Sequence, residues 1–148
     1  DYGEERFAQS VARAIAKARD AAPLVSTRQL AAVVAQAIGA RTRGDWRQDP
    51  AARTFQALRI AVNRELSEVS IALPRIVPLL ATGGRLAVIA FHSLEDRIVK
   101  HTLRARAAEG FGLRLRTKHP IVPSEAEIER NPRARSAKLR AAQMGHAS

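Results

Sequence analysis

Residues 83–96 read GGRLAVIAFHSLED, and the expected architecture is built outward from them. The glycine pair predicts a turn. The apolar run that follows, 86–91, does not alternate with polar residues, which is typical of a strand covered on both faces in a parallel sheet. Ligands of open parallel sheets bind beyond the carboxyl ends of the strands. We therefore expect His92, Ser93 and Asp96 at a ligand-binding edge, where they could orient a base or a catalytic group.

The same turn also has a simpler, structural interpretation. Ser93 and Asp96 have the spacing of a capping box, with Asp in place of the usual Glu, for a helix over roughly 94–106. In that case His92 is a solvated turn residue. Capping boxes are common, so spacing alone leaves both interpretations open.

Apolar residues at helical spacing predict three helices before the strand. They cover residues 4–20, a segment from Ser26 or Thr27 to Gly39, and a long helix that begins after Pro50. We expect the long helix to bury a single apolar stripe and to kink or stop near its two prolines. The stripe consists of Phe55, Leu58, Val62, Leu66, Val69 and Leu73, and the prolines are Pro74 and Pro78.

After the turn, the sequence predicts smaller elements. The segment 111–118 alternates leucine with arginine, which is the pattern of a half-exposed strand. Ser124 and Glu127 form a second capping box, for a short helix that ends at residues 131–132. A last strand is expected at 136–143. With the helices in front, this order predicts an α/β protein with a helical appendage.

The chain of 148 residues carries 25 Lys+Arg against 14 Asp+Glu, a net charge of +11. The excess is concentrated in 97–118, where Glu109 is the only acid, and in 131–148, which has none. Such an excess favours a polyanionic partner such as RNA, although a solvated basic face has the same composition. The residues considered for RNA contact are Arg59, Asn63, Arg97, Lys100, Arg133, Arg135 and Lys138.

Missing residue types exclude several classes of site. Without cysteine there is no disulfide, thiolate metal site or cysteine nucleophile, which fits a reducing cytoplasm. The four histidines have no metal-ligand spacing, so no metal is expected, and no dinucleotide-binding or nucleoside-triphosphate loop occurs. The apolar runs are far shorter than the roughly 20 residues that span a bilayer, so no membrane partner is expected.

Four longer stretches together resemble one known family. They are YGEERFA at 2–8, RTFQALRIAVNREL at 53–66, GGRLAVIAFHSLEDRIVK at 83–100 and NPRARSAKLR at 131–140. In this order and at this length they are similar to the ribosomal RNA small subunit methyltransferase H family. The resemblance implies a Rossmann-like, S-adenosylmethionine-dependent methyltransferase. It also implies an inserted helical subdomain at 1–55 and the C-terminal part of the methyltransferase domain at 56–148.

The implied reaction is methylation of the exocyclic N4 of a cytidine in the decoding region of 16S ribosomal RNA. The implied partner is small-subunit ribosomal RNA or the 30S particle, in the cytoplasm. His92, Ser93 and Asp96 would help to shape the cytidine pocket, and the strand at 85–91 would be central in the sheet. The family's glycine-rich cofactor loop has no counterpart in this sequence, so we assign no cofactor-binding residue. The chain is expected to be a fragment that is inactive alone.

Two other classes of function stay open at this level. A non-catalytic RNA-binding module would use the N-terminal helices and the basic tail, and would bind RNA without methyl transfer. A helical interaction fragment would self-associate, for instance as a homodimer, whether or not RNA is present.

Overall fold

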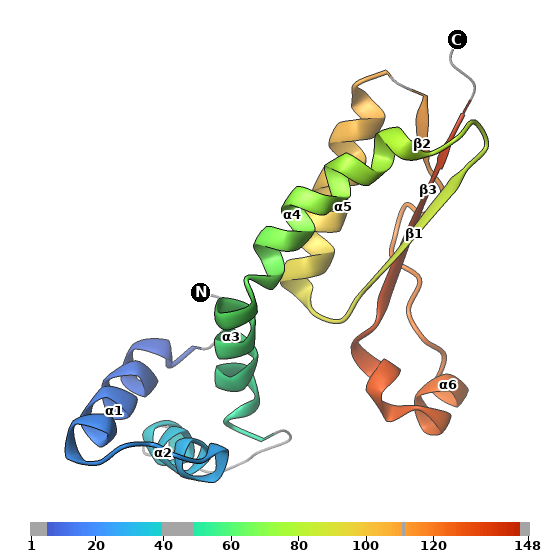
Figure 1. Cartoon of the computed structure of the whole chain (residues 1–148). Helices are drawn as coiled ribbons and strands as arrows, with labels where there is room; N and C mark the ends of the chain where they lie inside the picture. Colours follow the sequence, from blue (N-terminus) through green and yellow to red (C-terminus); the bar gives the residue numbers. More distant parts are fainter. Residues whose placement is uncertain (1–5, 40–48, 111, 146–148) are drawn as a thin grey trace. The chain divides into compact units, whose positions relative to one another are not determined.

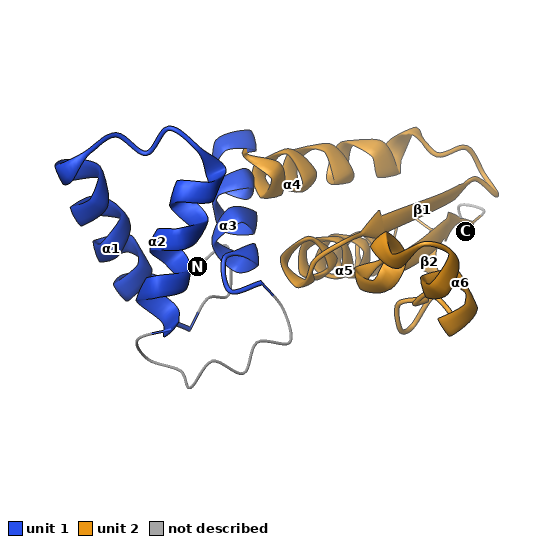
Figure 2. Ribbon diagram, turned by 90° about the horizontal axis from the view of Figure 1, so that it is seen from below, with its two compact units in different colours: residues 1–63 blue, residues 64–148 orange. Residues whose placement is uncertain are grey.

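The computed structural model describes residues 6–39, 49–110 and 112–145. The chain divides into two compact units, coloured separately in Figure 2. Unit 1 spans residues 1–63 and unit 2 spans residues 64–148. Each unit has its own hydrophobic core and is described by itself. Among the described residues, no helix is both long enough and apolar enough to cross a membrane.

Unit 1 is helical. Its elements are α1 (Ala8–Ala21), α2 (Thr27–Gly39) and α3 (Ala52–Asn63). The expected cap of α2 is confirmed, because the Gln29 N–H donates to Ser26 Oγ at 3.2 Å and the Gln29 side chain accepts from the Ser26 N–H at 3.1 Å. The start predicted at residue 4 lies outside the described residues. The core consists of Val11, Val34, Ile38 and Ala51, with Phe55 packed against it.

Unit 2 combines helices with a three-stranded sheet (Figure 1). Its main elements are α4 (Glu65–Ile76), β1 (Arg85–Ala90), α5 (Ser93–Ala108), β2 (Leu113–Leu115), α6 (Glu125–Arg130) and β3 (Lys138–Met144). Short 3-10 helices, η1 and η2, occupy Val77–Leu79 and Pro132–Ser136. α4 and α5 lie side by side, and α5 contacts all three strands. The core consists of Leu73, Val77, Val99, Leu103, Leu113 and Ala142.

β1 forms where the strand was predicted, at 85–91, but its neighbours differ from the predicted ones. The strand order is β1-β3-β2, so β1 is an edge strand of this sheet, and its partner β3 is antiparallel. Leu86 and Val88 pack on the core, whereas Ile89 is 56% exposed. Within the described sheet β1 is therefore an edge strand with an antiparallel neighbour, and its central place in a complete methyltransferase sheet stays a prediction. An apolar run shows that a strand can be covered on both faces, but it does not show which strand lies beside it.

α5 is a crossover helix between β1 and β2. Since both strands are antiparallel to β3, they run parallel to each other on its two sides. β3 confirms the last predicted strand, whereas β2 covers only three residues of the strand predicted at 111–118. The backbone ladder between β2 and β3 ends early because the Thr117 side chain replaces a backbone acceptor. The Ala141 N–H donates to Thr117 Oγ1, at 3.0 Å, and not to a backbone oxygen.

The long helix predicted after Pro50 is in fact two helices, α3 and α4. Arg64 lies between them with φ 55° and ψ 29°, a left-handed conformation that cannot continue a right-handed helix. The apolar stripe is also interrupted, because Leu58 and Val62 are 41% and 80% exposed. The boundary between the two compact units falls between Asn63 and Arg64 in the sequence. The division into an inserted subdomain and a methyltransferase part at residue 55 stays a prediction.

We predict that Arg64 is sensitive to the shape of its side chain. Arg64→Val should lower the free energy of unfolding by about 1–2 kcal/mol, because β-branched residues are strongly disfavoured at positive φ. Arg64→Gly removes the same charge and should keep or raise stability, since glycine adopts positive φ without a steric cost. Urea unfolding followed by circular dichroism compares the two variants. Equal stability would contradict a left-handed residue at this position.

Candidate functional site

The turn after β1 is closed by a helix cap that differs from the predicted one. His92 is the N-cap of α5, and its Nδ1 accepts the Glu95 N–H at 3.3 Å. Glu95 reaches back, and its Oε2 accepts the Phe91 N–H at 3.0 Å. The capping box predicted for Ser93 and Asp96 is therefore wrong by one residue. Ser93 is instead the first residue of α5 and is half-buried.

The cap leaves one ring nitrogen of His92 in an unusual position. The His92 side chain is only 8% exposed, and its Nε2 lies 3.4 Å from Glu95 Oε1 without forming a hydrogen bond. Nε2 has no hydrogen-bond partner among the described residues. A neutral imidazole whose Nδ1 accepts a hydrogen bond carries its hydrogen on Nε2. Within the described part of the chain, Nε2–H is therefore a buried donor without a partner, which a ligand reaches only when the side chains around it move apart.

The same histidine belongs to a group of possible metal ligands. One ligand atom each of Glu65, His92 and Glu95 lies within 4.8 Å of the others. A metal needs the lone pair of an imidazole nitrogen, however, and Nδ1 already uses its lone pair for the Glu95 N–H. With its hydrogen on Nε2, the ring cannot bind a cation there. The arrangement fits a hydrogen-bonding group better than a metal centre.

Asp96 forms an ion pair with Arg140 on β3. Arg140 Nε donates to Oδ1 at 2.6 Å and Nη2 donates to Oδ2 at 3.0 Å. The two side chains are only 14% and 9% exposed, and the pair joins α5 to the central strand. The hydrogen bonds from Arg140 lower the pKa of Asp96 below its ordinary value of 3.8, partial burial opposes them, and the charges of Arg140, Lys138 and Lys100 add to the lowering. Asp96 is therefore held as a carboxylate, with both oxygens engaged.

Some of the residues predicted to contact RNA gather near this pair. Lys100 and Lys138 both act on Asp96 through their charge. Arg133 and Arg135 are exposed on η2, the short helix just before β3, and Arg97 is exposed on α5.

The remaining two predicted RNA contacts lie in the other unit. Arg59 and Asn63 are exposed on α3, so their position relative to the turn is not defined. None of the predicted RNA contacts is tested by this placement.

Sequence reasoning missed Glu95, Glu65 and the role of Arg140. An ion-pair role of Arg140 could have been inferred. Arg140 lies on the same face of β3 as the fully buried Ala142, and a buried charge needs a partner. The sequence gives a weaker indication for Glu95. It lies three residues after His92, which is the spacing of a capping box, but histidine is an uncommon cap. Nothing in the local sequence brings Glu65, from α4, to this turn.

Comparisons with known proteins agree on one family. The model of the MraW methylase family matches residues 1–145. Proteins named ribosomal RNA small subunit methyltransferase H are similar to the chain: that of Nitrosospira multiformis is 51% identical over 97% of this chain and 50% of its own length. The one of Coprothermobacter proteolyticus is 54% identical over 97% of this chain and 46% of its own length. The chain thus spans about half the length of the curated relatives it matches.

We predict that the Asp96–Arg140 pair makes the stability of unit 2 sensitive to acid. Because the pKa of Asp96 is lowered in the folded protein, the stabilisation is complete above about pH 4 and is lost as the pH falls through the folded value. Asp96→Asn should cost about 2 kcal/mol at neutral pH, because it leaves the buried Arg140 charge unpaired. It should also flatten the acid dependence. Urea midpoints between pH 7 and pH 2 measure both effects.

A matched control is Glu109→Gln, which removes the exposed pair of Glu109 with Arg106. An exposed pair contributes about 0–1 kcal/mol, so this variant should stay close to the parent protein. If Asp96→Asn and Glu109→Gln had the same small effect, the Asp96–Arg140 pair would not stabilise the unit.

Proposed function

This chain belongs to the MraW methylase family, and from that premise we propose that the complete protein methylates the exocyclic N4 of a cytidine in 16S ribosomal RNA. The methyl donor would be S-adenosylmethionine and the target would lie in the decoding region. The observation that carries the proposal is the family match over residues 1–145. The printed names of the relatives support a small-subunit ribosomal RNA substrate.

The fold of unit 2 supports a Rossmann-like methyltransferase sheet. β1 and β2 are parallel and joined by the crossover helix α5, which is the building unit of wound α/β sheets. Beside β1, on the side away from β3, the described residues supply no strand. Ile89 and Phe91 are 56% and 54% exposed near this edge. We infer that further strands of the complete protein pair with β1, which would make it an inner strand, and that further helices cover the sheet face that carries these side chains.

We infer that the main binding site of the methyl donor lies outside the described residues. An adenosine cofactor usually lies against a glycine-rich turn between a strand and a helix. The one strand-to-helix turn of this kind, from β1 into α5, carries His92 and Ser93 instead of glycine. We therefore assign this chain's residues to the RNA side of the reaction and to the support of the site.

Methyl transfer to an amine needs no covalent enzyme nucleophile. The amino nitrogen bonds to the methyl carbon as the sulfur–carbon bond breaks, and the nitrogen loses one proton. The protein must hold the flipped base in line with the methyl group. The Nε2–H of His92 can donate to an acceptor on the base, such as the O2 or N3 atom of cytosine. Glutamate oxygens beside it, on Glu95 and Glu65, can accept from an amino group.

Within the predicted catalytic set, the three residues have different contacts. His92 carries the buried donor, so it is the strongest candidate for direct contact with the base. Asp96 has both oxygens engaged by Arg140, so we assign it a positioning role through α5. Ser93, at the first residue of α5, stays a candidate for contact with the substrate.

A non-catalytic RNA-binding module is the alternative function. The basic composition supports it, since the charge of +11 attracts any RNA. The family match favours the methyltransferase, because members of a methylase family are expected to carry out methyl transfer.

We predict that the complete protein transfers labelled methyl from S-adenosylmethionine to small ribosomal particles that lack the modification. Digestion of the RNA to nucleosides should yield N4-methylcytidine. Large ribosomal particles serve as the control and should remain unlabelled. Label in C5-methylcytidine, or RNA binding without label, would contradict the proposed reaction.

We also predict that substitutions can separate two roles of His92, as the cap of α5 and as a hydrogen-bond donor. His92→Asn keeps a side chain that caps helices well, so the stability should change by less than about 0.5 kcal/mol. It removes the Nε2 donor, and a lost hydrogen bond of about 1–3 kcal/mol corresponds to a rate of methyl transfer that is about fivefold to 150-fold lower. His92→Ala should lose the rate and also about 1 kcal/mol of stability. A fully active Asn variant would leave His92 with a capping role only.

A further inference from the structure

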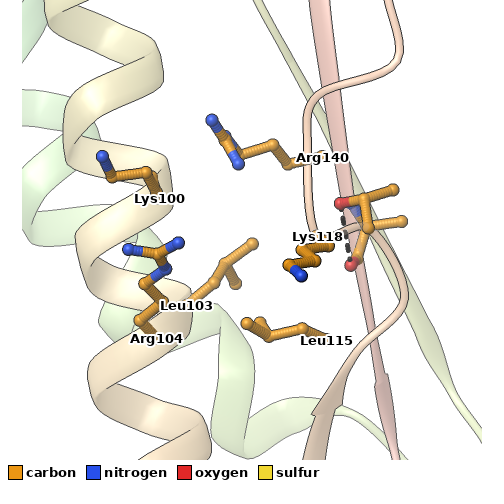
Figure 3. A pocket seen from close by; sticks show the side chains of 8 residues that line it. Lys100, Leu103, Arg104, Leu115, Lys118 and Arg140 are labelled. Carbon is orange, nitrogen blue, oxygen red and sulfur yellow. Dashed lines mark hydrogen bonds between the residues drawn. The ribbon is translucent and has the colours of Figure 1, made fainter.

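A basic hollow lies between α5 and the strands, on the same helix as the turn but further along it (Figure 3). It is shallow and open to solvent. We call it the α5–β3 basic pocket. It is lined by Lys100, Leu103, Arg104, Leu115, Thr117, Lys118, Arg140 and Ala141.

The charges around this pocket are nearly all positive. Lys100 and Arg104 are one helical turn apart on α5, and Lys118 and Arg140 line the pocket from the strand side (Figure 3). Asp96 is the nearby acid, but Arg140 engages both of its oxygens. Lys100, Arg104 and Lys118 have no hydrogen bond or ion pair within the described part of the chain. Like charges at such spacing repel each other, so an anion between them would be stabilised.

The walls of the pocket are held in place by the fold. Leu103, at its base, is only 2% exposed and belongs to the core of unit 2. On the strand side, the Thr117 hydroxyl is bound to the backbone of Ala141 in both directions, at 3.0 Å and 3.5 Å. This double contact fixes the backbone just before Lys118 against β3. The cations are therefore presented from anchored elements, unlike those of a freely solvated basic face.

The lining also indicates which part of an RNA would enter. It contains no aromatic side chain on which a base could stack and no carboxylate that could accept from a base amino group. It offers ammonium and guanidinium donors, which suit phosphate oxygens. Contacts of this kind set the position of a nucleic acid without reading its sequence.

We propose that the α5–β3 basic pocket binds a phosphodiester group of the RNA backbone, an inference that rests on the proposed RNA substrate. Asp96, Lys100 and Arg104 follow one face of α5 at four-residue intervals. At a rise of 1.5 Å per residue, Arg104 lies about 12 Å along the helix from Asp96. The phosphate would belong to a nucleotide close to the target base, and its capture would set the distance between the RNA backbone and the turn at His92.

The test compares two double variants of the complete protein. Lys100→Gln/Arg104→Gln removes an Arg and a Lys at four-residue spacing from the pocket. Arg13→Gln/Lys17→Gln removes the same pair of residue types at the same spacing from α1, where both are exposed. Equilibrium binding of the substrate RNA is measured over a range of salt concentrations, and thermal unfolding verifies the fold of each variant. Lys118→Gln, at an exposed residue outside helices and strands, is the second pocket variant if the double variant fails to fold.

Each phosphate contact contributes about 0.7–0.9 to the slope of log affinity against log salt. The pocket variant should lose about this much slope, which is about a fivefold loss of affinity at 0.1 M salt, whereas the control should keep the parent slope. Equal losses in both variants would overturn the proposal, because net charge alone would explain them. An unchanged slope in the pocket variant would also overturn it.

Two further measurements separate the possible sources of failure. If inorganic phosphate at constant ionic strength binds the pocket but leaves RNA affinity unchanged, the ligand is a free anion and the proposal is wrong. Methyl transfer by the parent protein is assayed independently. If the parent protein methylates RNA but the pocket variants keep the parent's salt slope, the pocket proposal is rejected and the proposed reaction stands. A slope loss without methyl transfer supports the pocket and rejects the proposed reaction.

Discussion

The ion pair between Asp96 and Arg140 connects the two parts on which unit 2 is built. Arg140 lies on β3, the strand that joins β1 to β2, and Asp96 lies in the first turn of the helix that covers them. The pair therefore sets how α5 is rotated about its axis. That rotation places His92 at one end of the strand and the cations of the basic pocket further along the same helix. A single buried charge pair thus orients both surfaces that we assign to RNA.

Local chemistry made part of the fold predictable. The caps at Ser26 and Ser124 depend on residues three positions apart, and both form as the sequence indicates. The last strand also forms where its apolar residues predict it. The direction and order of the strands were not predictable, because β1 pairs with residues about fifty positions away. The break at Arg64 was not predictable, because apolar residues keep their helical spacing on both sides of it. The left-handed backbone of Arg64 has no counterpart in that spacing.

The candidate site shows the same limit at smaller scale. The sequence indicated a polar turn after a strand, and that turn lies between β1 and α5, whereas its role in ligand binding stays a prediction. It did not distinguish His92 from Ser93 as the cap, because the two are adjacent and each has an acid three residues later. The partner of Asp96 lies 44 residues away, so only the folded chain shows that this carboxylate is engaged. We therefore propose that this carboxylate supports the helix and does not contact a base.

The edge of β1 has a consequence for how copies of this chain behave in solution when the further strands that we infer beside β1 are absent. An edge strand with exposed Ile89 and Phe91 beside it is a template for pairing with another molecule. The charge of +11 opposes such encounters, because copies repel one another. Salt shortens the reach of this repulsion to about 8 Å at physiological ionic strength while leaving the apolar attraction intact. The colloidal stability of the chain should therefore decrease with added salt, even under conditions where its fold is unaffected.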